Sequence, residues 1–262
     1  METTLIWFGN APLVIAHRGA SVHAPENTIA AFSLAAELGA DAVELDAKLT
    51  VDGQVVVHHD RTLDRTTTGT GPLKARTLEE LQRLDAGSHF NLSYAGERIP
   101  TLSEVFRAVA DRLLINIELS NYASPLDCLP EAVVKLVHEF GLEKRVLLSS
   151  FNPAGLIKVR KLAPEIQLGL LTDAKEPRWL RLFFGMFTPH EAIHPSMTLI
   201  SEEMIEDQHR QGRWVNVWTV NELENIKRLV HLGVEGVITD VPDLAREVVQ
   251  EIHLDNREEG GG

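Results

Sequence analysis

Short apolar runs typical of buried strands alternate along the chain with longer segments whose apolar residues recur every three or four positions. The strand-like runs lie at residues 13–16, 42–48, 113–118, 146–149, 166–171, 192–194, 214–218 and 236–239. The helix-like segments lie at residues 29–38, 102–110, 129–140, 153–162, 179–187, 202–211, 222–232 and 244–252. Alternation of this kind predicts a parallel sheet whose strands are joined by helices.

Eight strand–helix units within about 250 residues match the number in a TIM (β/α)8 barrel. A doubly wound open sheet is the alternative, but eight alternating units favour closure of the sheet. The first strand is not followed by G-x-G-x-x-G, so the usual dinucleotide fingerprint is absent from the sequence. We therefore predict an α/β protein with the TIM barrel fold, with a single domain over residues 1–252 and a polar tail at 253–262.

The regular alternation is interrupted between residues 49 and 100. This segment contains a turn at 51–54, a β-rich run at 55–57, a Thr- and Gly-rich stretch at 66–72 and a short helix-like stretch at 78–84. A turn that short folds the chain back on itself as a hairpin. We interpret residues 49–100 as a small insertion after strand 2 that lies over the active-site end of the barrel.

Composition narrows the range of partners. The chain has 262 residues and a formal net charge of −13, which disfavours nucleic acid and anionic membranes because both attract positive charge. An anionic substrate remains compatible, because a bound divalent cation reverses the local sign. The sequence shows no apolar stretch long enough to span a membrane, and the single cysteine, Cys128, fits a reducing compartment. We expect a cytoplasmic protein without stable membrane insertion, and leave a homo-oligomer open.

Polar residues gather at the predicted strand ends, where TIM barrels form their active sites. Glu44 and Asp46 end the second strand, and Glu118 ends the third. Side chains two residues apart on a strand share a face and lie roughly 6–7 Å apart. Like charges placed so are poor for a structural core, but three carboxylates are a suitable oxygen-ligand set for Mg²⁺ or Ca²⁺. The H-E-x-x-H spacing of zinc sites does not occur in the sequence.

Histidines approach the same end of the barrel. His17 ends the first strand, and His58 and His59 follow the hairpin, which returns to the level of the carboxylates. Adjacent residues of an extended segment face opposite ways, so only one of His58 and His59 faces the site. Two histidines there supply a general base and a general acid for attack on phosphorus. Arg18 fits equally as a partner for a phosphate and as a structural partner for the carboxylates.

Several motifs resemble those of the glycerophosphodiester phosphodiesterase family, and they extend from residue 17 to residue 242. They are His17-Arg18-Gly19-Ala20, Pro25-Glu26-Asn27-Thr28, Glu44-Leu45-Asp46, Asp52-Gly53, His59-Asp60, Leu63, Arg65-Thr66-Thr67, Trp218-Thr219-Val220-Asn221 and Gly236-Val237-Ile238-Thr239-Asp240 with Pro242. The resemblance implies a TIM barrel with a small insertion after strand 2. It also implies hydrolysis of glycerophosphodiesters to sn-glycerol 3-phosphate and an alcohol, assisted by Mg²⁺ or Ca²⁺, with Mn²⁺ as an alternative.

Carried over by position, the resemblance gives each candidate residue a role. The implied acid/base pair is His17 and His59, the implied metal ligands are Glu44, Asp46 and Glu118, and the implied substrate contacts are Arg18, Ser120 and Trp218. Ser120 is a departure, because the family usually has a lysine there, and a neutral hydroxyl makes a hydrogen bond roughly half as strong as a charge-assisted one. Trp218 would line the glycerol pocket or simply pack.

Two other functions compete with this hypothesis. One is a lysophospholipase D-like or other phosphodiesterase on the same barrel, for which the apolar segment at 179–187 would have to open onto the site. That segment could also be a subunit interface or part of the core, and core packing is the default expectation. The other is a non-enzymatic relative that binds glycerol phosphate. The sequence leaves open whether water or the substrate's 2-hydroxyl attacks, and which histidine is the acid.

Overall fold

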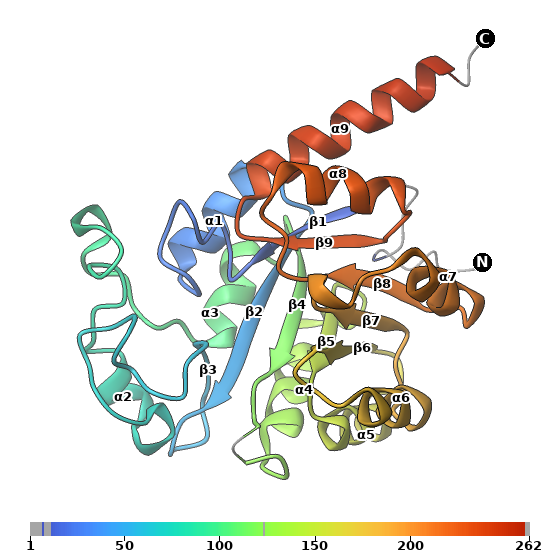
Figure 1. The fold of residues 1–262 in the computed structure, drawn as a ribbon. Coiled ribbons are helices and arrows are strands. Elements are labelled where there is room, and N and C mark those ends of the chain that lie inside the picture. Colours follow the sequence, from blue (N-terminus) through green and yellow to red (C-terminus); the bar gives the residue numbers. More distant parts are fainter. Residues whose placement is uncertain (1–6, 8–11, 123, 260–262) are drawn as a thin grey trace.

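The computed structural model describes residues 7, 12–122 and 124–259, which form a closed barrel of parallel strands surrounded by helices (Figure 1). The barrel strands are β1 (Leu13–His17), β2 (Ala42–Leu49), β4 (Leu114–Leu119), β5 (Val146–Ser150), β6 (Gln167–Thr172), β7 (Ala192–Pro195), β8 (Trp214–Val217) and β9 (Gly236–Thr239). Each strand pairs in parallel with the next in this order, and β9 pairs with β1, so these eight strands close into a barrel. The predicted TIM barrel is confirmed.

Helices follow the barrel strands and cover the outside of the sheet. They are α1 (Ile29–Glu37), α3 (Leu102–Val109), α4 (Leu129–Phe140), α5 (Pro153–Leu162), α6 (Arg178–Phe187), α7 (Glu202–Arg210), α8 (Leu223–His231) and α9 (Pro242–Glu259). In α3, Thr101 and Glu104 form a capping box, and Leu102, Val105, Phe106 and Val109 are buried. That spacing places them on one face of the helix, toward the sheet. None of the described helices is long and apolar enough to cross a membrane.

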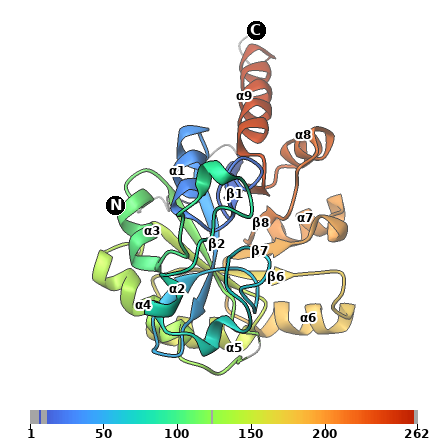
Figure 2. The same ribbon diagram turned by 90° about the vertical axis from the view of Figure 1, so that its left-hand side faces the viewer.

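The insertion lies between β2 and α3 and has a small core of its own. Its strand β3 (Val55–Val57) pairs antiparallel with the end of β2, and its helix α2 spans Leu78–Leu81. Two short 3₁₀ turns, at Leu73–Ala75 and Leu92–Tyr94, complete it. The buried residues of this small core are Val56, Leu63, Leu73, Leu81, Ala86 and Ile99. Figure 2 views the molecule from the side on which the insertion lies.

The two ends of the barrel differ in chemistry. At the amino ends of the strands, Trp7 is 2% exposed and packs with buried residues such as Ile15, Leu147 and Ile238. Apolar side chains therefore fill this end, whereas the carboxyl ends carry buried polar groups such as Glu44 and Asp46. A ligand site is consequently confined to the carboxyl end.

Two segments differ from the sequence-based expectation. The last helix, α9, continues to Glu259 instead of ending at residue 252, because its sequence contains no glycine or proline between Asp243 and Gly260. Core packing, the default expectation for α6, holds only in part: Phe184 packs against the main core, but no residue of the helix is fully buried, and Trp179 and Met186 are 68% and 73% exposed. The helix is amphipathic, but its outward face is the apolar one.

The turn after β1 requires glycine at position 19. Gly19 has φ +85°, and a Cβ there would lie 2.6 Å from the carbonyl carbon of Ala31. We expect Gly19→Ala to lower the free energy of unfolding by about 1–3 kcal/mol more than Gly53→Ala, in urea denaturation. Gly53 is the matched control, because its φ is +76° but nothing lies within 4 Å of the added Cβ. Equal losses in the two variants would show that the contact with Ala31 is not limiting.

Candidate active site

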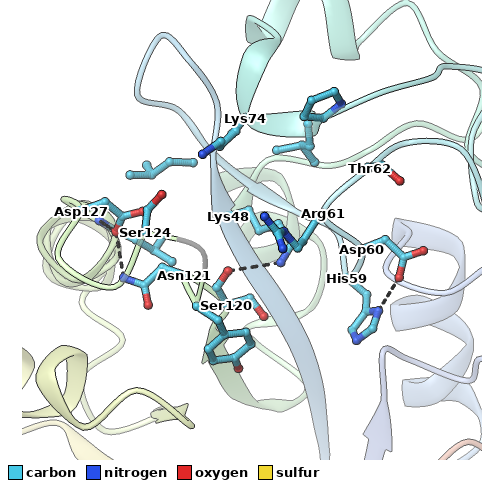
Figure 3. A pocket seen from close by; sticks show the side chains of 15 residues that line it. Lys48, His59, Asp60, Arg61, Thr62, Lys74, Ser120, Asn121, Ser124 and Asp127 are labelled. Atoms are coloured by element: carbon cyan, nitrogen blue, oxygen red, sulfur yellow. Dashed lines mark hydrogen bonds and ion pairs between the residues drawn. The ribbon is translucent and has the colours of Figure 1, made fainter.

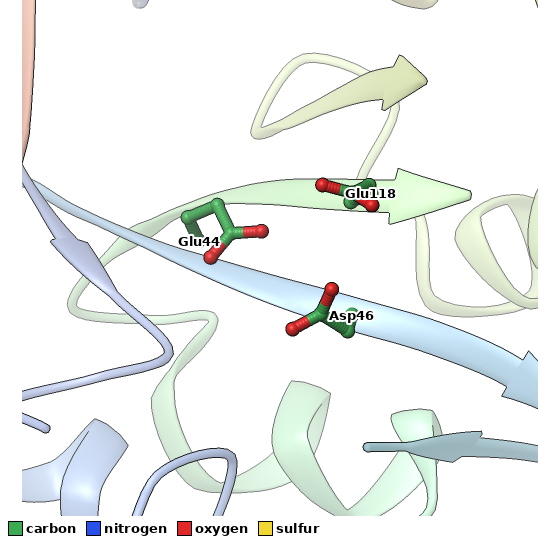
Figure 4. Close-up of side chains that lie close together, drawn as sticks. All are labelled: Glu44, Asp46 and Glu118. Carbon is green, nitrogen blue, oxygen red and sulfur yellow. The ribbon is translucent and has the colours of Figure 1, made fainter. Parts of the chain in front are cut away.

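Three carboxylates converge at the carboxyl ends of β2 and β4 (Figure 4). The parallel register sets Asp46 beside Glu118, and strand alternation sets Glu44 on the same face as Asp46. One oxygen from each of the three residues lies within 4.8 Å of the others. Glu44 and Asp46 are buried, and Glu118 is half-buried. The sequence-based prediction that these residues form one cluster is therefore matched by the geometry.

The pKa shifts in this acidic cluster indicate more negative charge than the neighbouring cationic groups compensate. Burial, together with the charges of Asp46 and Glu118, raises the pKa of Glu44 well above its ordinary value. Burial and the charge of Asp46 raise the pKa of Glu118 to about 7. Burial also acts to raise the pKa of Asp46, but the charges of Arg18, His59 and Lys48 and the hydrogen bond from Asn27 together outweigh burial, so the net shift is downward. Oxygen donors at this spacing, short of positive charge, suit a hard divalent cation.

Neighbouring side chains hold the carboxylates in place. Asn27 Nδ2 donates to Asp46 Oδ2 at 3.0 Å, and Asn27 itself has φ +58°. Ser120 Oγ donates its single proton to Glu118 Oε1 at 2.8 Å and shares it with Asp46 Oδ1, which lies 3.2 Å away. The Tyr122 hydroxyl also donates to Glu118. The Ser120 hydroxyl is thus occupied by the cluster. Ser120 was predicted as a substrate contact, and that contact stays a prediction. Tyr122 was not among the predicted site residues, because it lies on a loop without a periodic pattern.

Arg18 is joined to the cluster through both its backbone and its side chain. It has φ +56°, and its backbone N–H donates to Glu44 Oε2 at 3.2 Å. Its Nη1 donates to Glu26 Oε1 at 2.9 Å, and its Nε lies 3.5 Å from Asp46 Oδ2. Of the two roles weighed for Arg18, the structural pairing with carboxylates is therefore present in the structure. A non-glycine residue held at positive φ is costly and is common at functional sites.

Two histidines face the site, and each has its Nδ1 atom held by a carboxylate. His17 Nδ1 lies 2.6 Å from Asp240 Oδ1, and its Nε2 lies 3.9 Å from Glu44. His59 Nδ1 lies 2.7 Å from Asp60 Oδ1. In both, a carboxylate on Nδ1 orients the ring and leaves Nε2 directed elsewhere. His58 is buried, with Nε2 3.1 Å from the Thr62 carbonyl oxygen, so His59 is the member of the pair that faces the site.

A chain of ion pairs joins the His59 loop to the barrel. Arg65 donates from Nε to Asp60 Oδ2 at 2.7 Å and from Nη1 to Glu26 Oε2 at 2.6 Å. Glu26 in turn accepts from Arg18, which lies beside Asp46. Hydrogen bonds from Arg65 and Arg18 lower the pKa of Glu26 against the effect of burial. This link could not be predicted from the sequence, because Arg65 and Glu26 lie on irregular loops 39 residues apart.

A pocket of about 710 Å³ lies next to the acidic cluster, because Ser120 and Tyr122, which contact Glu118, line it. Figure 3 shows the side chains that line this pocket. β2, the insertion and the loop from β4 to α4 form its wall, and His59, Ser120 and Tyr122 mark its inner end. Lys48 also lines it, and its Nζ donates to the Ser120 carbonyl oxygen at 3.2 Å. Lys48 was not among the predicted site residues. Its position was predictable, since Lys48 lies two residues after Asp46 on the same strand and therefore shares its face.

Trp218 lies apart from this pocket. Its Nε1 donates to the His194 carbonyl oxygen at 2.7 Å, and its ring meets Phe151 edge-on at 5.6 Å between centroids. Phe151 in turn meets Tyr122 edge-on at 5.6 Å. The rings of Trp218, Phe151 and Tyr122 thus form a row, and Tyr122 at its end donates to Glu118. Packing is therefore observed for Trp218, and its predicted glycerol contact stays a prediction.

A closed parallel barrel with an acidic cluster and two carboxylate-held histidines at its carboxyl end has the layout of a hydrolytic enzyme. Residues 17–244 match the Glycerophosphoryl diester phosphodiesterase family. A glycerophosphodiester phosphodiesterase of Caldanaerobacter subterraneus subsp. tengcongensis is 44% identical over 241 residues, which cover 91% of this chain and 98% of that protein. One from Bacillus altitudinis is 37% identical over 246 residues, covering 91% and 98%.

Solved structures agree with these relatives. An Oleispira antarctica phosphodiesterase in complex with the product sn-glycerol-3-phosphate superposes with a TM-score of 0.84 at 31% identity, covering 92% of this chain and 97% of that one. A glycerophosphodiester phosphodiesterase from Thermotoga maritima gives a TM-score of 0.72 at 29% identity, covering 92% and 99%. The chain belongs to the glycerophosphoryl diester phosphodiesterase family. It is a phosphodiesterase of the TIM barrel class, as the sequence motifs indicated.

The environment of Asp240 predicts a measurable dependence of stability on pH. Burial would raise the pKa of Asp240, but hydrogen bonds from His17, Asn221 and Ser21 lower it to about 2. Because the folded pKa is depressed, the stabilisation is present above the ordinary value of 3.8 and is lost as pH falls through about 2. We expect the difference in unfolding free energy between wild type and Asp240→Asn to shrink by about 2 kcal/mol from about pH 5 to about pH 2.

Chemical denaturation across that pH range measures the effect. The exposed Asp111, replaced by Asn, is the control and should leave the wild-type pH dependence in place. A difference between wild type and Asp240→Asn that stays constant with pH would show that Asp240 is not held by its partners in solution.

Proposed function

We propose that this protein is a metal-dependent glycerophosphodiester phosphodiesterase that hydrolyses glycerophosphodiesters to sn-glycerol 3-phosphate and an alcohol. The observation that carries the proposal is the acidic cluster of Glu44, Asp46 and Glu118 flanked by two histidines that carboxylates hold at Nδ1. The relatives support the substrate class, since they are glycerophosphodiester phosphodiesterases and the Oleispira antarctica enzyme was solved with sn-glycerol-3-phosphate.

Glu44, Asp46 and Glu118 would hold a divalent cation, Mg²⁺ or Ca²⁺ with Mn²⁺ as an alternative. Such a cation supplies positive charge that attracts the phosphodiester and polarises a phosphoryl oxygen. The protein's own contribution is to keep the three oxygens within 4.8 Å of one another. Asn27, Ser120 and Tyr122 do so through their hydrogen bonds to the carboxylates. Arg18, beside Asp46, would turn its remaining donors to the phosphate.

The two histidines would move the protons. One Nε2 accepts the proton of the attacking oxygen and the other donates a proton to the leaving alcohol. His59 lines the 710 Å³ pocket, where an alcohol could be accommodated, so we assign it as the acid. His17 lies 3.9 Å from Glu44, on the barrel side of the cluster, so we assign it as the base. Asp240 and Asp60 keep the two rings in the orientations that these roles require.

The competing functions have less support. A lysophospholipid-specific enzyme was expected to use α6 as a lip of the site, but no residue of α6 lines the pocket beside the cluster. A non-enzymatic binding protein would not need two histidines with matching carboxylate partners. Membership of an enzyme family, with every predicted catalytic and ligand residue present, further disfavours it.

Removal of metal tests the cofactor. We expect EDTA-treated protein to release sn-glycerol 3-phosphate from glycerophosphodiesters more than about 100-fold more slowly, because a bound cation contributes several kcal/mol of transition-state stabilisation. Addition of Mg²⁺, Mn²⁺ or Ca²⁺ should restore turnover in wild type but not in Glu44→Gln, which keeps the shape and removes the charge. Full turnover in EDTA, with metal shown to be absent by elemental analysis, would contradict the proposal.

Replacement of the histidines tests the acid/base pair. His17→Ala and His59→Ala should each lower kcat by about 10²–10⁴-fold while leaving the circular dichroism spectrum unchanged. His138→Ala is the matched control, because His138 also pairs with a carboxylate, Glu165, at 2.7 Å, but on the surface at the last turn of α4. Unchanged turnover in either active-site variant would sink the assignment of that histidine.

A further inference from the structure

The pocket beside the acidic cluster has a cationic wall. Lys48, Arg61 and Lys74 all line it, although the chain as a whole carries a formal net charge of −13 (Figure 3). Lys48 comes from β2 and is half-buried, whereas Arg61 and Lys74 come from the insertion and are exposed. The three cations therefore follow the pocket from its inner end, next to Ser120, toward solvent.

These three cations have unused capacity for an anion. Lys48 Nζ makes one hydrogen bond, to the Ser120 carbonyl oxygen at 3.2 Å, and an ammonium group has three donors. Within the described part of the chain, no carboxylate oxygen lies within 4.0 Å of the side-chain nitrogens of Lys48, Arg61 or Lys74. Asp46, Glu118 and Asp60 act on Lys48 only over longer distances.

The two acidic residues of the pocket are occupied by other partners. Asp60 accepts hydrogen bonds from Arg65 and lies 2.7 Å from His59 Nδ1. Asp127 Oδ1 accepts from Asn121 Nδ2 at 2.8 Å and from the Leu129 backbone N–H at 3.1 Å. Neither carboxylate is paired with a cation of the pocket wall. A ligand in the pocket therefore meets a surplus of positive charge.

The position of the pocket indicates which part of a substrate it would receive. Its inner end is formed by His59, which faces the acidic cluster, and by Ser120 and Tyr122, which donate to Glu118. Trp218 and Phe151 lie on the other side of Tyr122 and do not line the pocket. With the reacting phosphate at the cluster, the pocket extends from the side of His59. A volume of about 710 Å³ lies within the range of small-molecule sites.

We propose that this pocket binds the alcohol half of the diester and selects alcohols that carry a second anionic group, such as a phosphate. The proposal rests on the proposed function, since it assigns the leaving alcohol to the side of the site on which His59 lies. Lys48 would contact the inner part of the alcohol, and Arg61 and Lys74 would face its anionic group. Cationic alcohols such as choline would be disfavoured, because like charges across a binding surface cost affinity.

A matched set of substrates tests the selection. In glycerophosphoglycerol the leaving alcohol is glycerol. In 1,3-bis(glycerophospho)glycerol the leaving alcohol also begins with a glycerol unit, but that unit carries an additional phosphodiester. We expect kcat/KM for the second to exceed that for the first by about tenfold at low salt, and because each compound has two glycerol ends, no correction for the number of ends is needed. Glycerophosphocholine should be the poorest of the three. The preference should weaken in high salt, because exposed charges are screened.

Variants of the outer cations test which residues cause the preference. Arg61→Gln combined with Lys74→Gln should reduce the ratio of kcat/KM between the two glycerol substrates to within about twofold of unity. Lys161→Gln is the matched control and should keep the wild-type ratio, because Lys161 lies in the last turn of α5, at the opposite end of the barrel. A preference that survives in the double variant would overturn the assignment to Arg61 and Lys74.

The outcomes separate this proposal from the one it rests on. Metal-dependent turnover of all three substrates with equal kcat/KM would overturn the selection and leave the phosphodiesterase function standing. Failure to turn over any of them with any added cation, in folded protein, would overturn the proposed function and this proposal with it. A preference for glycerophosphocholine would show that the pocket favours the opposite charge.

Discussion

Mutual repulsion among three enclosed carboxylates is the constraint on which the rest of the site depends. At 4.8 Å, the upper limit of their separations, and an effective dielectric constant of about 20, two unit charges repel by about 3.5 kcal/mol. Nothing in the packing of the barrel requires this arrangement, since apolar residues fill the opposite end. The surrounding groups compensate part of the negative charge of the three carboxylates. Arg18 lies beside Asp46, and Asn27, Ser120 and Tyr122 donate hydrogen bonds. The remainder is the charge that a divalent cation would neutralise.

The positions of the site residues on strands were predictable from the sequence, because they follow from the alternation of side chains between the two faces of a strand. The alternation of faces along β2 placed Glu44 and Asp46 together, and the parallel order of β2 and β4 added Glu118. The same alternation places Lys48 on the face that carries Glu44 and Asp46, so its position beside the site also follows from the sequence. The contact of His17 with Asp240 was also within reach, since closure of the barrel brings the ends of β1 and β9 together.

Loop contacts were not predictable, because no period governs them. The pairing of Arg65 with Glu26 depends on the path of two irregular segments, and the Tyr122 hydrogen bond depends on the loop after β4. The expected core packing of α6 was not observed for most of the helix, for a different reason. Its apolar residues follow a helical pattern, but the pattern alone does not decide whether that face contacts the sheet or solvent. The two histidines differ in the same way. The position of His17 follows from its place on a barrel strand, whereas His59 lies on a loop whose conformation depends on the ion pair between Arg65 and Asp60.

The division of side chains on β2 also bears on how the barrel assembles. Val43, Leu45 and Ala47 belong to the large buried cluster that includes residues of the surrounding helices, while Glu44 and Asp46 face inward. A shift of one residue in the pairing of β2 with β4 would exchange these two sets. Two carboxylates would then be pressed against apolar helices, at a cost of several kcal/mol for each unpaired charge. The acidic residues thus act during folding as well, by making the misaligned barrel far less stable than the correctly aligned one.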